Sequence, residues 1–137
     1  MERSEDIFKI SRDKARAKDL FEMANERLSI IIDSIPKSVT YKLLEEYYET
    51  AIQLITSIMY SDGYKTLSHV SLIQFMANYN LDNAEIHILD QMRKFRHGTV
   101  YYGRKESGNF YINHEKEIKR IIDKLINIAK AKFREIK

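Results

Sequence analysis

The sequence predicts an all-α protein, an antiparallel up-and-down helical bundle of four long helices plus one short helix. Only four Gly and one Pro occur in 137 residues, so few positions interrupt regular structure. Apolar residues recur at spacings of three and four along nearly the whole chain, which is the helical period. The sequence contains no repeat, linker or low-complexity segment, and residues 1–137 are therefore expected to form a single domain.

The first long helix is expected to run from Ser4, a good N-cap residue, to about Asp33. Pro36 then interrupts the chain. The apolar positions of this helix have helical spacing and are Ile7, Ile10, Ala17, Phe21, Ala24, Leu28 and Ile31.

The second helix is expected from its cap Ser38 to about Tyr60. It is apolar around much of its circumference, which predicts a position at the centre of the core. Gly63 follows in the sequence Ser-Asp-Gly and suits the left-handed conformation that ends many helices.

The short helix is expected to be capped by Thr66 or Ser68 and to end near Asn78. The fourth helix then begins at Asp82, which forms a capping-box pattern with Glu85, and ends near Gly103.

The last helix is expected after a loop over residues 104–113, with a turn at Ser107 and Gly108 and a cap at Asn113. Its apolar stripe consists of Ile118, Ile122, Leu125, Ala129, Phe133 and Ile136.

Composition limits the classes of protein that this chain can belong to. A net charge of +3, from 23 basic and 20 acidic residues, does not by itself indicate nucleic-acid binding. The absence of Cys excludes disulfides and thiolate metal sites. No apolar run has the length of a membrane span, and the first six residues lack the apolar core of a signal peptide, so a cytoplasmic protein is expected.

Basic, imidazole and phenol groups are concentrated between Asp90 and Arg104. On a helical wheel, the core face of this helix is expected to contain Ile88, Met92, Phe95, Thr99 and Tyr102. The opposite face is expected to contain Arg93, His97, Tyr101 and Arg104, with Lys94 nearby. Arg96 falls at the core boundary beside Leu89, and Gly98 in the helix body lets a backbone or a phosphate come close.

These side chains suit phosphate chemistry. The planar fork of Arg matches phosphate oxygens, His97 can move protons at neutral pH, and Tyr101 can donate a proton. A simpler interpretation also stands, because cations are favoured at a helix C-terminus and a charged helix face is often only solvated. His69 is interpreted as a helix-start or packing residue.

Three segments together resemble HEPN domains (higher eukaryote and prokaryote nucleotide-binding). Residues 47–52, Tyr-Tyr-Glu-Thr-Ala-Ile, resemble the central helix of that family. Residues 63–69, Gly-Tyr-Lys-Thr-Leu-Ser-His, resemble its turn with a Ser-His pair, and residues 89–103 resemble its signature helix. The resemblance covers nearly the whole chain and implies the same five-helix order.

The resemblance also implies roles for individual residues. Arg96 stands at the signature Arg, His97 where Asn is frequent, and Tyr101 where the signature His would be. Active members are metal-independent endoribonucleases in which the RNA 2′-hydroxyl attacks, His moves protons and Arg steadies the phosphate. The implied catalytic residues are therefore Arg96, Tyr101 and His97.

The expected function is nucleotide or RNA binding, as one half of a toxin–antitoxin-like pair with a minimal nucleotidyltransferase. The expected contacts to RNA or nucleotide are Arg93, Lys94, Arg96, Tyr102 and Arg104. The resemblance implies a homodimer, and Tyr101 or Tyr102 as a target for nucleotidylation. The alternatives are an active metal-independent endoribonuclease and a noncatalytic structural interaction module. No metal motif or Gly-rich phosphate loop is present, so neither a metal nor a cofactor is expected.

Overall fold

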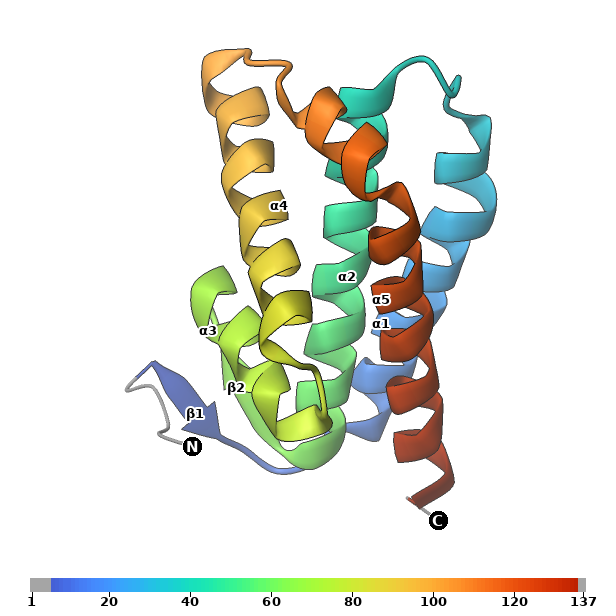
Figure 1. Cartoon of the computed structure of the whole chain (residues 1–137). Helices are drawn as coiled ribbons and strands as arrows, with labels where there is room; N and C mark the ends of the chain where they lie inside the picture. Colours follow the sequence, from blue (N-terminus) through green and yellow to red (C-terminus); the bar gives the residue numbers. More distant parts are fainter. Residues whose placement is uncertain (1–5, 136–137) are drawn as a thin grey trace.

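The helices of the computed structural model, which describes residues 6–135, stand side by side as a bundle (Figure 1). The predicted all-α helical bundle is confirmed. In chain order the elements are β1 (Ile7–Lys9), α1 (Lys14–Glu26), a π-helical stretch (Arg27–Ile32), α2 (Thr40–Asp62), β2 (Tyr64–Thr66), α3 (His69–Phe75), a 3₁₀ turn (Met76–Tyr79), α4 (Asn83–Tyr102) and α5 (Ser107–Glu135).

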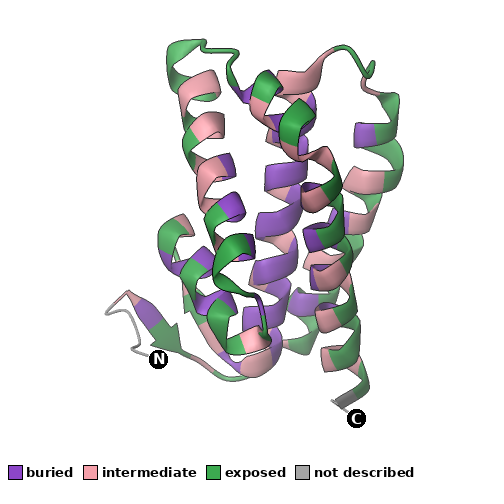
Figure 2. Ribbon diagram, viewed as in Figure 1, coloured by how far each residue is buried: buried purple, intermediate pink, exposed green. Residues whose placement is uncertain are grey.

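Helix α2 lies at the centre of the bundle, as its apolar circumference predicts. It contacts α1, α3, α4 and α5, and buried residues occur along its whole length (Figure 2). Its largest fully buried side chains are Leu44, Tyr48, Leu54, Ile55, Ile58 and Met59. Burial of this many large side chains makes α2 the element on which the other helices are positioned.

The first helix begins later than predicted. It starts at Lys14, where the Asp13 side chain accepts a hydrogen bond from the Arg16 amide at 3.0 Å. Ile7 belongs instead to β1, which pairs antiparallel with β2. In this pairing Ile7 lies opposite Thr66. The pairing satisfies backbone hydrogen-bonding groups and buries the Ile7 side chain, and both favour a strand here over a longer α1. The predicted cap Ser4 lies outside the described residues.

The predicted cap of α2 is wrong, because Val39 occupies the N-cap with no side-chain cap hydrogen bond and Ser38 has no capping role. Helix α5 is kinked at His114, where the backbone is non-helical, so the predicted last helix after the cap Asn113 corresponds to the part of α5 beyond the kink. Residues 107–113, predicted as part of a loop with a turn at Ser107 and Gly108, instead form the first part of α5.

The start of α5 is fixed by contacts that are distant in sequence. The hydroxyl of Ser107 lies 2.8 Å from that of Thr99 on α4. The ring of Tyr111 stacks on Tyr47 of α2 at a centroid separation of 5.7 Å. These contacts hold residues 107–113 against the bundle before the chain bends at His114. Ile136, predicted in the last apolar stripe, lies outside the described residues.

The local signals around α3 and α4 were read correctly. Gly63 has φ +85° and ends α2. Ser68 rather than Thr66 caps α3, accepting from the Ser71 amide at 3.2 Å. The predicted Asp82–Glu85 capping box is present at the start of α4. No helix of the described residues is long and apolar enough to cross a membrane.

Candidate functional site

Helix α4 places the predicted residues, and its buried face agrees with the wheel at most positions. Ile88 and Met92 are buried, and Phe95 and Thr99 are half-buried. Tyr102 is the exception, because its side chain is 66% exposed in the last turn of the helix. Its ring contacts Arg104 and His97 rather than the core, at 5.4 Å from the guanidinium carbon and 5.8 Å from the imidazole centroid.

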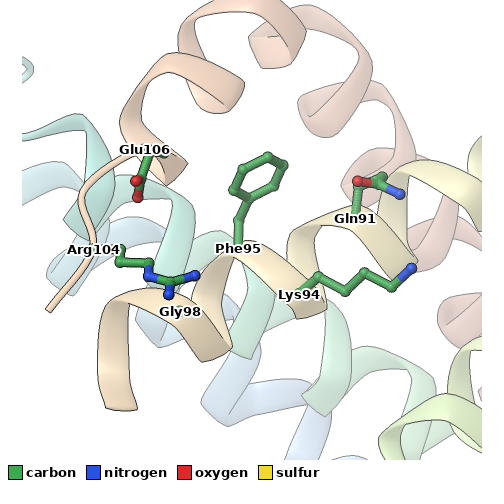
Figure 3. Close-up of a pocket in the computed structure, with 6 residues that line it drawn as sticks. All are labelled: Gln91, Lys94, Phe95, Gly98, Arg104 and Glu106. Carbon is green, nitrogen blue, oxygen red and sulfur yellow. The ribbon is translucent and has the colours of Figure 1, made fainter. Parts of the chain in front are cut away.

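The predicted cations divide between two hollows on either side of α4. The first, here called the α3–α4 hollow, has a volume of about 320 Å³ and is lined by Tyr48, Ser68, His69, Val70, Arg93, Arg96, His97 and Tyr101. The second, the α4–α5 hollow, has a volume of about 350 Å³ and is lined by Gln91, Lys94, Phe95, Gly98, Arg104 and Glu106 (Figure 3). Arg93 and Arg96 are therefore brought together, whereas Lys94 and Arg104 lie in a separate place.

Arg96 is fixed in position between α2 and α4. One terminal nitrogen lies 2.8 Å from a carboxylate oxygen of Glu49. Its guanidinium carbon lies 5.9 Å from the ring centroid of Tyr48, and its buried Nε has no hydrogen-bond partner in the described chain. The carboxylate and the ring orient the guanidinium and leave part of its hydrogen-bonding capacity unused.

Arg93 and Lys94 share one carboxylate. The Nε of Arg93 donates to Asp90 at 2.9 Å, and the Lys94 amine lies 3.5 Å from the other oxygen of Asp90. Burial acts to raise the pKa of Asp90, but the hydrogen bond and charge of Arg93, together with the charge of Lys94, lower it overall. Asp90 therefore stays ionised and orients both cations near neutral pH.

His69 is a residue of the α3–α4 hollow that the sequence-based site did not include. Its Nδ1 lies 2.8 Å from the hydroxyl of Tyr48. Burial lowers the pKa of His69 and raises that of Tyr48, so both groups are neutral near pH 7. The Ser-His pair that opens α3 was noticed in the sequence, but only tertiary packing shows that His69 lies beside Arg93, Arg96 and His97 of α4.

His97 and Tyr101 lie on the exposed side of the same hollow, as the wheel predicted. Their ring centroids are 4.6 Å apart, and the Tyr101 side chain is 64% exposed. The hollow thus combines two guanidinium groups, two imidazoles and an accessible phenol ring. The negative charges of Glu49 and Asp90 neutralise those of the two arginines. The hollow is therefore an ordered set of hydrogen-bond donors and not a strongly positive patch.

The chain matches no protein-family model, no curated protein and no solved structure. The chemistry of the site is therefore argued from its own residues. Among the described residues, no group of three or more His, Asp or Glu side chains is placed to hold a metal ion.

Proposed function

We propose that the protein is a HEPN-like binder of RNA or nucleotides and that the α3–α4 hollow holds the phosphate. One observation carries the proposal, the convergence of Arg93, Arg96, His69 and His97 on a single hollow. Guanidinium forks match phosphate oxygens, and imidazole N–H groups add further donors. Tyr101 at the exposed side offers a ring face on which an RNA base can stack.

The acidic neighbours of the arginines shape this binding. Glu49 and Asp90 hold the guanidinium groups in place before a ligand arrives, which lowers the ordering cost of binding. They also compete with phosphate for the same donors. We therefore expect modest affinity that depends strongly on salt concentration, as for other phosphate-dominated complexes.

Titration of single-stranded RNA at several salt concentrations tests the proposal. Arg93→Met should weaken binding and reduce the slope of log affinity against log salt by about 0.7 for each lost phosphate contact. Arg120→Met, at an exposed position on α5, is the matched control and should bind like wild type. Equal binding by both variants, with circular dichroism showing that both are folded, would refute the proposal and favour a structural interaction module.

The second candidate function is metal-independent RNA cleavage, and the observation favouring it is the pair of imidazoles in the hollow. By the resemblance, Tyr101 stands where active HEPN members have the signature His, but His69 and His97 lie beside the same arginines. In this reaction the 2′-hydroxyl attacks the adjacent phosphorus, giving a 2′,3′-cyclic phosphate and a free 5′-hydroxyl. One side chain takes the proton of the 2′-hydroxyl and another protonates the leaving oxygen.

Cleavage of mixed RNA in the presence of a chelator separates this function from binding alone. The enzyme proposal expects cleavage by wild type and by His87→Gln, an exposed control on α4, and its loss in His97→Gln. If wild type binds RNA without cleaving it, the enzyme proposal is refuted and the binding proposal is retained.

Partner proteins are part of the same proposal. The last turn of α4 exposes Val100, Tyr101 and Tyr102, an apolar surface suited to a second copy of the chain or to a nucleotidyltransferase. Analytical ultracentrifugation tests the homodimer. Mass spectrometry after incubation with a nucleotidyltransferase and ATP tests whether either exposed tyrosine is modified.

A further inference from the structure

The α4–α5 hollow is distinct from the site described above, because the two share no lining residue. Figure 3 shows Phe95 pointing into the opening between α4 and the start of α5. Gln91 and Lys94 lie on one side of this ring, and Arg104 and Glu106 lie on the other. The hollow therefore has an aromatic wall in the middle and hydrogen-bonding groups at both ends.

The absence of a side chain at Gly98 leaves space in this hollow. A Cβ added at this position would meet only Arg104, at 3.7 Å from its Cδ and 3.9 Å from its Cβ. The Phe95 ring packs against Phe110 at a centroid distance of 4.9 Å, which fixes its orientation. A flat ligand entering beside Gly98 thus meets a rigid aromatic wall.

We propose that the α4–α5 hollow is a nucleobase subsite for single-stranded RNA bound at the α3–α4 hollow; this inference rests on the proposed function. A base would pack against Phe95, while Lys94 and Arg104 bind the phosphates on either side of it. Glu106 would hydrogen-bond one edge of the base, and Gln91, on the other side of the ring, would hydrogen-bond the opposite edge. Guanine is the base that fits, because its two adjacent N–H donors match the two oxygens of one carboxylate.

The two hollows adjoin along the exposed side of α4. Asp90 marks the boundary, since one of its oxygens contacts Arg93 of the first hollow and the other contacts Lys94 of the second. Consecutive residues of a helix point about 100° apart, so Arg93 and Lys94 aim at neighbouring parts of the surface. An RNA backbone crossing the helix at this point passes from Arg93 to Lys94, the two cations that flank the Asp90 carboxylate, which favours a strand over a single nucleotide.

Filling the second hollow tests the inference. Gly98→Met places a flexible side chain in the hollow and replaces a poor helix former with a good one, so the fold should be retained. Affinity for an oligouridine of roughly ten nucleotides with one central guanine should fall about tenfold or more. Affinity for a uridine mononucleotide should be unchanged. Ala84→Met, at an exposed position near the start of α4 and outside both hollows, is the control and should bind both ligands like wild type.

Glu106→Gln tests base recognition separately. Wild type should bind the guanine-containing oligonucleotide more tightly than one with adenine at the same position, and the variant should lose this preference. An equal gain in affinity for both oligonucleotides would overturn the nucleobase assignment, since it would show that Glu106 only repels phosphate.

The failures of the two proposals are distinguishable. If Gly98→Met binds the guanine oligonucleotide like wild type while Arg93→Met binds it more weakly, the second subsite is overturned and the first is retained. Wild-type binding in both variants would overturn both.

Discussion

The hydroxyl of Tyr48 lies 2.8 Å from Nδ1 of His69, so a fully buried residue of the central helix holds the first residue of α3. The centroid of the same ring lies 5.9 Å from the guanidinium carbon of Arg96 on α4. Tyr48 thereby fixes the two sides of the α3–α4 hollow relative to each other. The site is organised by the core itself, without a flexible loop.

Tyr48→Phe should lower the free energy of unfolding by about 1 kcal/mol, because it removes one buried hydrogen bond while keeping the ring. Urea unfolding measures this change. The control is Tyr60→Phe, whose hydroxyl makes an exposed contact with Arg16 and whose loss should cost under about 0.5 kcal/mol. Equal losses in the free energy of unfolding would mean that the Tyr48–His69 hydrogen bond contributes no more than the exposed one at Tyr60.

Acid should destabilise the protein through His69. Its pKa in the folded chain is lowered by burial from the ordinary value of 6.5. As pH falls below 6.5, the unfolded chain binds a proton at His69 before the folded chain does, and stability falls until the folded pKa is passed. His69→Gln should flatten the decline in urea midpoint below pH 6.5, whereas the exposed-site variant His87→Gln should retain it. A decline that is the same in wild type and His69→Gln would contradict this assignment.

Arg96→Met should destabilise the protein by about 1–3 kcal/mol, because Glu49 is left partly buried without its cation. Adding Glu49→Gln should restore much of that loss while phosphate binding remains weak. The double-mutant cycle, measured by urea unfolding and RNA titration, separates the two roles of Arg96. Full recovery of RNA binding in the double variant would exclude Arg96 from ligand contact.

The two glycines at the end of α4 should respond to alanine in opposite directions. Gly98→Ala should stabilise the protein by about 0.5–1 kcal/mol, since the position is helical and the added Cβ makes only ordinary contacts. Gly103→Ala should destabilise it by about 1 kcal/mol, because φ is +65° there. Thermal unfolding of both variants tests the pair, and a loss of stability in Gly98→Ala would mean that the helix is strained at that point.

Local patterns predicted most of the fold. The helical period located α2 and α4, and Gly63, Ser68 and the Asp82–Glu85 box marked helix ends through interactions that span only a few residues. Strand β1 was missed because its partner β2 is distant in sequence and three residues carry too little pattern. The helical segment over residues 107–113 was missed for a similar reason, since its contacts with α2 and α4 join residues that are distant in sequence.

The site was predicted in part. Arg93, Arg96, His97 and Tyr101 do share one hollow, because residues at these spacings fall on neighbouring parts of a helix surface. Lys94 and Arg104 were expected in the same patch but lie on the α5 side of the helix. His69 and the carboxylate Glu49 came from other helices, and no spacing rule connects them to α4.

Strand β1 has a consequence for motion at the site. It is paired through only three residues, yet it contacts the segment that leads directly into Ser68 and His69. The Ser71 hydroxyl also donates to Asp6 at 2.7 Å, so the N-terminal segment fastens the start of α3. Such a short pairing opens at a lower free energy than the core, and its amides should exchange with solvent long before those of α2. Each opening removes the contacts of β1 and Asp6 with the segment leading into α3, while the Tyr48–His69 contact and the buried side chains of α3 hold that wall of the hollow in place.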